Sequence, residues 1–132
     1  MKIKDVPAFQ KNMEVLSMDI KTTVLEAARE MEKRNVGSVI VTEGKMLCGI
    51  VTERDLLRRV VAKNISPDGI FLEDIMTSKL DIVTPEDTTA KAVELMTNGN
   101  FRHLPVVGEY GEVISMLSQR DFYAALRDLR AS

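Results

Sequence analysis

Apolar and polar residues follow one another along this chain in an order that occurs twice. Each half begins with a short extended stretch, EVLSM at residues 14–18 and LDIVT at residues 80–84. The segments 22–35 and 87–99 follow. In each, threonines stand near the start and apolar residues then recur at helical spacing. This spacing predicts an amphipathic helix in each half.

The second part of each half has the pattern of a hairpin and a closing helix. Residues 37–51 and 104–117 each hold two β-rich runs around a glycine-containing loop, which predicts a β-hairpin. Helices are then expected from Thr52 to about residue 63 and from Ser118 to about residue 129. The order strand, helix, strand, strand, helix, written twice, predicts an α+β fold with a small sheet and packed helices in each half.

The two halves align at an offset of 65 residues, as from Asn35 to Asn100, which rises to 66 after the hairpin loop. We therefore expect a first repeat with an N-terminal lead-in over residues 1–66 and a second repeat over 67–132. Each repeat is near the size at which a single core is marginal, so we expect the repeats to pair with pseudo-twofold symmetry. Residues 72–76 between them predict one helical turn.

The helical spacing also predicts core residues. In the first helix of each repeat these are Val24, Ala27, Ala28 and Met31, and Ala92, Val93 and Met96. In the closing helix of the first repeat we expect apolar residues to point inward and basic residues to be solvated, respectively Leu56, Leu57, Val60 and Val61, and Arg58, Arg59 and Lys63. Most methionines are expected to fill the core: Met31, Met46, Met76 and Met96.

Composition excludes several classes of function. The chain has 132 residues, a net charge of -2 and 5% aromatic residues, which gives nucleic-acid binding little support. The only cysteine, Cys48, is expected in the core, and with the only histidine, His103, it cannot form a zinc site. No nucleophile–base pair points to an enzyme. No signal peptide or membrane span is recognisable, so we expect a cytoplasmic protein.

Both closing helices begin with the same short motif, TERD from Thr52 to Asp55 and SQRD from Ser118 to Asp121. A hydroxyl residue followed three positions later by an acid is typical of a helix-capping box. The same residues could also bind a ligand, because a carboxylate is the usual acceptor for ribose hydroxyls and a helix N-terminus attracts phosphate. The motif alone leaves both roles open.

The motifs together resemble the CBS domain family. The pattern Gly-apolar-apolar-Thr/Ser-x-x-Asp follows NVGSVIV in one copy and FRHLPVV in the other, and TVLEA at Thr23 to Ala27 fits the family's helix start. The two copies resemble a tandem CBS pair, or Bateman module. The family's glycine is Ser115 in the second copy, where we expect a narrower pocket, and the family's proline is Ile40 in the first.

The resemblance implies a regulatory module without catalytic activity or cofactor. Such pairs bind adenosine-containing ligands (AMP, ADP, ATP or S-adenosylmethionine) and commonly form homodimers through the closing helices, here with Phe122, Tyr123, Leu126 and Leu129 from the second copy. This chain would then be a stand-alone sensor that signals to a separate effector protein. The alternative is a structural or oligomerisation module whose pockets stay empty.

The resemblance also implies two ligand sites. Site one would use Ile50, Thr52, Arg54, Asp55, Thr77, Ile82, Arg102, His103 and Leu104. Site two would use Val15, Leu16, Val36, Gly37, Ser38, Val39, Met116, Ser118, Arg120 and Asp121. Because Arg102 and His103 belong to site one, we expect a phosphorylated ligand to prefer it. Site two has Gly37 and Ser38 at those positions, so it would take a less charged ligand or stay empty.

Overall fold

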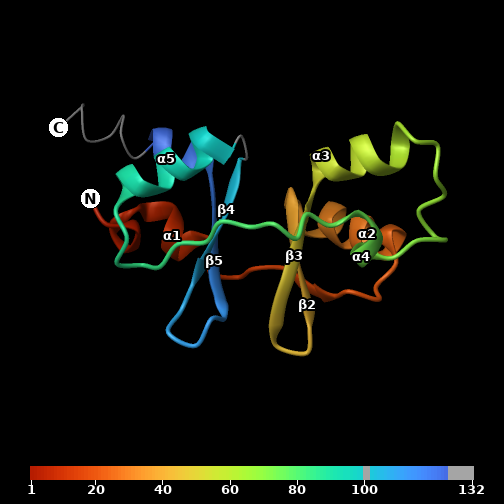
Figure 1. Cartoon of the computed structure of the whole chain (residues 1–132), viewed down its shortest axis with the longest axis horizontal. Helices are drawn as coiled ribbons and strands as arrows, with labels where there is room; N and C mark the ends of the chain where they lie inside the picture. Colours follow the sequence, from red (N-terminus) through yellow and green to blue (C-terminus); the bar gives the residue numbers. More distant parts are fainter. Residues whose placement is uncertain (100–101, 125–132) are drawn as a thin grey trace. The chain divides into compact units, whose positions relative to one another are not determined.

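The computed structural model describes residues 1–99 and 102–124 and contains two compact units (Figure 1). One unit, called here the repeat-1 unit, runs from Leu16 to Leu80. The other, the repeat-2 unit, combines Met1–Val15 with Asp81–Ser132. The sequence repeats divide the chain once, at residue 66, whereas packing places the N-terminal lead-in with the second repeat and residues 67–80 with the first.

The repeat-1 unit is a three-stranded sheet with helices. Its elements are β1 (Ser17–Asp19), α2 (Val24–Arg34), β2 (Ser38–Glu43), β3 (Met46–Thr52), α3 (Glu53–Leu56), the π-helix η2 (Leu57–Val61) and α4 (Leu72–Ile75). The strand order is β1-β2-β3, with β1 parallel to β2 and β2 antiparallel to β3. β2 and β3 form the predicted hairpin, and Gly44 turns the chain with a positive φ of 62°.

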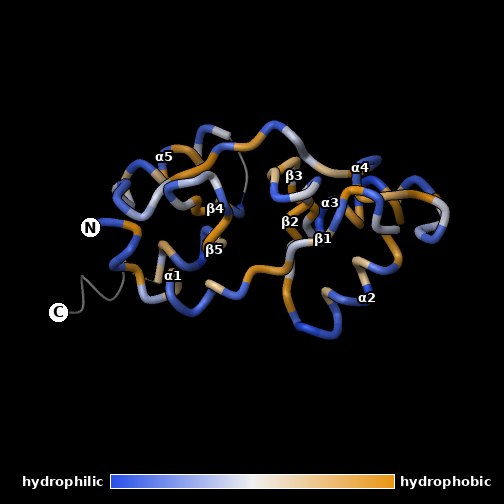
Figure 2. The backbone as a smooth tube through the Cα atoms, turned by 90° about the horizontal axis from the view of Figure 1, so that it is seen from below, coloured by the Kyte–Doolittle hydropathy of each residue, from blue (hydrophilic) through white to orange (hydrophobic). Residues whose placement is uncertain are grey.

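The helix α2 begins and ends as its sequence predicts. Thr23 is the N-cap and accepts a hydrogen bond from the Glu26 amide, and Asn35 ends the helix in the left-handed conformation. Val24, Ala27 and Met31 are buried and join β2 and β3 in one apolar core. β2 holds the fully buried Val39, Ile40 and Val41, and Figure 2 shows hydrophobic colour around the β2 and β3 labels.

The repeat-2 unit repeats this order with a shorter first strand. Its elements are η1 (Ile3–Asp5), α1 (Pro7–Lys11), α5 (Thr89–Gly99), β4 (His103–Val107) and β5 (Val113–Ser118), and residues 119–124 are helical. β4 and β5 are antiparallel. The predicted strand at residues 80–84 is reduced to one parallel bridge, between Val83 and Val106. The predicted α+β fold with two repeats is confirmed.

The lead-in and the linker have equivalent places in the two units. The amides of Ile3 and Lys4 donate to the carbonyls of Asp87 and Pro85, and 69 positions later Leu72 and Glu73 donate to Thr22 and Ile20. The accepting residues, Thr22 and Asp87 in one pair and Ile20 and Pro85 in the other, are 65 positions apart, which is the repeat offset. Buried side chains anchor each segment in the core beside it: Ile3, Val6 and Phe9 in one unit, Leu72 and Ile75 in the other. Each repeat is therefore completed by the segment that precedes the other repeat in the sequence.

Ion pairs also hold the lead-in, and they predict a pH dependence. Lys2 and Lys4 lie 2.7 Å and 2.8 Å from the Glu86 carboxylate, and their hydrogen bonds lower the pKa of Glu86 to about 2. Because this pKa lies below the unfolded value, the contribution is complete above about pH 4.5 and is lost as the pH falls towards 2. All three side chains are exposed, so we expect a small effect. The melting temperature of Glu86→Gln should be slightly below that of the wild type at pH 6 and should approach it at pH 2.

The closing helix of the repeat-1 unit corrects one prediction. Val60 is buried and Leu56 half-buried, but Leu57 and Val61 are 58% and 69% exposed. Val60 belongs to the core of the unit and Leu56 packs against it, whereas Leu57 and Val61 do not. Arg59 is exposed but not simply solvated, because its guanidinium donates to two carbonyls.

Three other expectations about burial change. Met46 lies beside the hairpin turn and is 70% exposed, so it fills no core, and Cys48 is only half-buried. Phe122 is 1% exposed and belongs to the core of the repeat-2 unit, so it offers no side chain to a dimer interface, whereas Tyr123 is 55% exposed. The expectations for Leu126 and Leu129 lie outside the described residues.

Candidate functional site

The two aspartate motifs fold as the same capping turn. The Thr52 amide donates to Asp55 Oδ2 at 2.9 Å, and the Asp55 amide donates to Thr52 Oγ1 at 3.3 Å. In the second copy the Ser118 amide donates to Asp121 Oδ2 at 2.8 Å, and the Asp121 amide to Ser118 Oγ at 3.3 Å. The expectation of a capping box is therefore correct in both copies. In both, the cap uses the Oδ2 oxygen, and Oδ1 is not part of it.

Strand pairing places each turn beside the start of the preceding strand in its own unit. Thr52 pairs with Ser38, and the Glu53 amide donates to the Gly37 carbonyl at 3.0 Å. Ser118 pairs with His103, and the Gln119 amide donates to the Arg102 carbonyl at 2.9 Å. The register thus confirms that Gly37 and Ser38 are the counterparts of Arg102 and His103.

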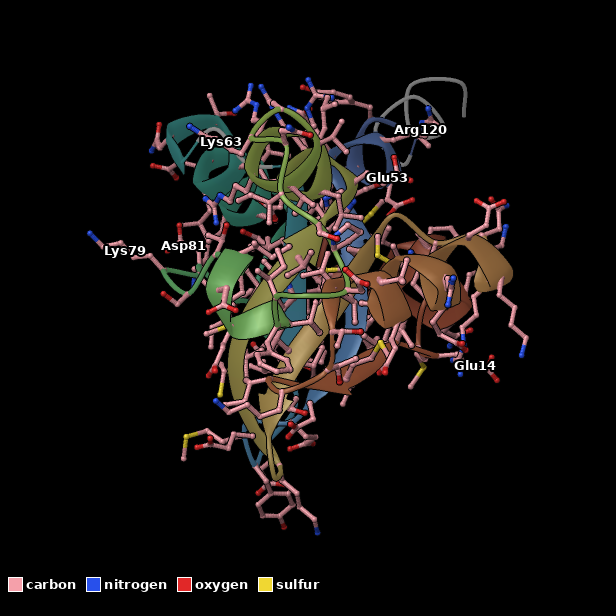
Figure 3. All side chains as sticks on the ribbon, turned by 90° about the vertical axis from the view of Figure 1, so that its right-hand side faces the viewer. Glu14, Glu53, Lys63, Lys79, Asp81 and Arg120 are labelled. Atoms are coloured by element: carbon pink, nitrogen blue, oxygen red, sulfur yellow. The ribbon has the colours of Figure 1, made fainter. Side chains whose placement is uncertain are left out.

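This pairing changes the local electrostatics of the second turn. In the repeat-2 unit, the structure brings Arg102 and His103 beside Ser118–Asp121. The exposed Arg120, labelled in Figure 3, belongs to the same turn. In the repeat-1 unit, Thr52–Asp55 has Gly37 and Ser38 beside it and its own exposed Arg54. The assignment of Arg102 and His103 to the ligand held by Asp55 rests on the family resemblance and stays a prediction.

Arg59 adds a contact that the sequence interpretation missed. Its Nε lies 3.9 Å from Asp55 Oδ1, and its Nη1 donates to the carbonyls of Ile75 and Met76 at 2.7 Å and 3.1 Å. A guanidinium at the last carbonyls of α4 completes that helix end. The spacing of four residues from Asp55 is the signal in the sequence that could have identified it.

The linker residue Thr77 lies against β3 in the repeat-1 unit. The amides and carbonyls of Ile50 and Thr77 exchange two hydrogen bonds, at 2.9 Å and 3.0 Å. The structure therefore brings together two predicted site-one residues, Ile50 and Thr77, one strand residue away from the Thr52 turn. Ile50 itself is 6% exposed.

Packing within each unit, rather than room for a ligand, explains the residue type at Gly49 and at its counterpart Ser115. A Cβ on Gly49 would lie 2.8 Å from the Thr77 carbonyl oxygen and 2.8 Å from Met76 Sδ, so the linker needs a glycine there. Its counterpart Ser115 is fully buried, and its Oγ donates to the Phe9 carbonyl at 2.9 Å. The expectation that Ser115 narrows a pocket is therefore wrong, because its side chain is bonded to α1.

Several predicted lining residues are core residues. Leu16, Val39 and Leu104 are 7%, 0% and 0% exposed and pack in the cores of their units. Val15, Val36 and Met116 are half-buried. Ser17 pairs with Ile40, and Val83 pairs with Val106. At the repeat offset of 65, the counterpart of Ile82 is therefore Ser17, rather than Val15 or Leu16. Ser17 is exposed, and Ile82 is 44% exposed. The alternation of Leu16, Met18 and Ile20 was the sequence signal for this register.

Two features are absent from the part of the chain that the structure describes. Over residues 1–99 and 102–124, no three His, Cys, Asp or Glu side chains are grouped so that they could hold a metal ion. In the same part of the chain, none of the helices has the length and apolar character needed to cross a membrane.

Comparison with curated proteins gives relatives from plants. The chain is 40% identical over 103 residues to the CBS domain-containing protein CBSCBSPB2 of Arabidopsis thaliana, covering 77% of this chain and 19% of that protein. It is 39% identical over 109 residues to the mitochondrial CBS domain-containing protein CBSX3 of the same plant, covering 79% and 52%. The chain thus spans between about a fifth and a half of these relatives.

Comparison with solved structures and family models identifies the fold over the whole chain. The CBS domain protein PAE2072 from Pyrobaculum aerophilum, solved in complex with AMP, is 30% identical over the full length of both chains, with a TM-score of 0.82. The family model of the CBS domain matches residues 3–62 and 72–128. The chain therefore belongs to the CBS domain family and is a tandem pair of these domains.

Proposed function

We propose that this CBS pair is a regulatory module without catalytic activity that binds an adenosine ligand, with AMP as the first candidate, and passes the signal to a separate effector protein. The single observation that supports this most is the AMP complex of the Pyrobaculum aerophilum relative, which is matched over its full length. A ligand with different affinity for two states of the module would shift their populations, and a partner would read that shift.

The chemistry of the two turns fits such a ligand. A carboxylate whose Oδ2 is fixed by a cap can accept ribose hydroxyls at its other oxygen, Oδ1. Arg54, Arg102, His103 and Arg120 belong to or lie beside the two turns and are suited to phosphate. We retain the ranking from the sequence, in which a phosphorylated ligand depends more on Asp55 than on Asp121.

Ligand-induced stabilisation tests the function as a whole. Melting of the purified chain would be followed with AMP, ADP, ATP, S-adenosylmethionine and, as a control, GMP. A ligand at 100 times its Kd should stabilise the folded state by about 2.7 kcal/mol. No shift with any adenosine ligand would favour the second candidate, a structural or oligomerisation module with empty pockets. That candidate is supported by the capping boxes, which already give each aspartate a structural role.

We further propose a homodimer, with the exposed pair Leu57 and Val61 contributing to its interface. Two apolar side chains one turn apart on a helix surface are suited to burial against a partner. Replacing Leu57 with aspartate should convert the dimer to a monomer in light scattering after gel filtration. Lys63→Asp is the matched control, because Lys63 is an exposed residue of the same segment and should leave the dimer intact. A dimer that survives L57D would place the interface elsewhere.

The cytoplasmic location also stays a proposal, and one relative, CBSX3, is named as mitochondrial. Fractionation of cells that express a tagged chain would test it.

A further inference from the structure

Asn12 lies directly after α1 and contacts the second aspartate turn. Its Nδ2 donates to the Met116 carbonyl at 3.0 Å and to Asp121 Oδ2 at 3.3 Å, and the side chain is half-buried. We propose that Asn12 is a positioning residue for ligand binding at the Ser118–Asp121 turn, supplied by the N-terminal lead-in. This inference rests on the proposed function, since it assigns a role at one of the two proposed ligand-binding turns.

The lead-in is held firmly enough to present Asn12 in one place. Phe9, three residues earlier, is buried in the core of the repeat-2 unit, and its carbonyl accepts the hydrogen bond from Ser115. The amide of Asn12 itself donates to the Ala8 carbonyl at 2.9 Å and so ends α1. The backbone of Asn12 and the Asp121 carboxylate are therefore both held within one unit.

The hydrogen bond determines how the Asp121 carboxylate is oriented. Asp121 Oδ2 already accepts from the Ser118 amide, and Asn12 donates to the same oxygen. Two donors on one oxygen restrict rotation of the carboxylate and keep Oδ1 pointing in one direction. Oδ1 is the oxygen that the cap leaves for ribose hydroxyls, so a fixed direction lowers the ordering cost of binding.

The first turn is held in a different way. There Arg59 of the same helical segment lies 3.9 Å from Asp55 Oδ1, and the position that corresponds to Arg59 in the second repeat, 66 residues later, is an alanine, Ala125. Asp55 thus has a cation from its own helix, whereas Asp121 has a neutral amide from the lead-in. Only the second turn should therefore respond to changes in the N-terminal segment.

The test is a titration read separately at each turn by NMR. The probes are AMP and its 2′,3′-dideoxy analogue, which lacks the ribose hydroxyls, and the amide signals of Thr52 and Asp55 and of Ser118 and Asp121 report the two turns. In Asn12→Ala, the Kd for AMP at Ser118 and Asp121 should rise roughly three- to tenfold. The Kd at Thr52 and Asp55 should not change, nor should either Kd for the dideoxy analogue.

Two further variants separate positioning from a general effect on folding. Asn12→Asp has the same shape but replaces the donating amide with a second carboxylate, so we expect a larger loss at the second turn. Gln10→Ala removes an exposed amide from the same helix and should change neither Kd. Combining Asn12→Ala with Asp121→Ala should cost no more affinity than Asp121→Ala alone.

Equal losses for AMP and the dideoxy analogue in Asn12→Ala would overturn the positioning role, because they would indicate a general distortion of α1. AMP binding that appears only at Thr52 and Asp55, or that is unchanged in Asn12→Ala and Asn12→Asp, would also overturn it while leaving the proposed function intact. A wild-type chain that binds none of the adenosine ligands would overturn the proposed function, and the role of Asn12 with it.

Discussion

Replacing Gly49 with alanine will lower the free energy of unfolding by about 2 kcal/mol, although it adds only one methyl group. The new Cβ would stand 2.8 Å from the Thr77 carbonyl oxygen and 3.0 Å from Met76 Cγ. The Met76 side chain can rotate away, but the Thr77 carbonyl is held by the Ile50 amide at 3.0 Å. Relief therefore requires the linker to move away from β3, which breaks this pair of backbone hydrogen bonds.

Urea denaturation of the variant measures this effect. Gly69→Ala is the matched control, because a Cβ there meets only the Ser66 carbonyl oxygen, at 3.7 Å, and φ lies outside the left-handed region. We expect the control to change stability by less than about 1 kcal/mol. Equal stability of the wild-type protein and G49A would mean that residues 76–77 do not lie as close to Gly49 as they do in the structure.

The second repeat offers a reciprocal comparison. Ser115 replaces the glycine there, and its hydroxyl donates to the Phe9 carbonyl because α1 lies at a distance that a serine can bridge. Transferring that residue to the first repeat, as Gly49→Ser, should destabilise at least as much as alanine does. The same residue is thus stabilising in one copy and excluded from the other.

The sequence predicts the elements of this fold well because their causes are local. Thr23 and Asn35 cap α2 through bonds to residues of its own first and last turns, and Gly44 turns the hairpin by its own backbone conformation. The two aspartate turns are likewise built from contacts three residues apart. Periodicity and short motifs carry this kind of information, so the repeated order of elements and both caps could be predicted from the sequence.

Contacts between distant segments could not be predicted in the same way. Asn12 meets Asp121 across 109 positions, and the Ser115 hydroxyl meets Phe9 across 106. Neither residue type nor spacing marks these pairs, since they depend on which repeat the lead-in packs against. The expectation that Ser115 narrows a pocket was wrong for this reason.

The first strand lies between these two cases. Leu16, Met18 and Ile20 alternate with polar residues, which in a strand places Ser17 on the opposite face from the core. The sequence interpretation instead gave Val15 or Leu16 the place in site two that Ile82 has in site one. The second copy has only one parallel bridge in its described residues here, at Val83. The register of the first strand therefore had to come from the backbone pairing.

Replacing Asp55 with alanine will weaken AMP binding by about 100-fold if the Thr52–Asp55 turn holds the ribose. A carboxylate that accepts two ribose hydroxyls makes two hydrogen bonds to a charged group, together worth roughly 3 kcal/mol, and each 1.4 kcal/mol is tenfold in Kd. Isothermal titration of AMP measures the loss. Under the ranking proposed above, Asp121→Ala should cost less than Asp55→Ala.

The variant also removes a helix cap, so the control must do the same without touching the proposed site. Asp74 provides it, because its Oδ2 accepts from the Phe71 amide at 2.8 Å in the same geometry at the start of α4. Each replacement by alanine should cost about 1 kcal/mol of stability. Only Asp55→Ala should lose affinity as well.

The pair of measurements therefore decides between the two roles that the motif left open. Equal stability losses in Asp55→Ala and Asp74→Ala with unchanged AMP affinity in both would make the first turn a cap alone. A larger loss of affinity from Asp121→Ala would instead place the phosphorylated ligand at the second turn, where strand pairing sets Arg102 and His103 beside Ser118 within one unit. Arg102 would then act on the turn next to it.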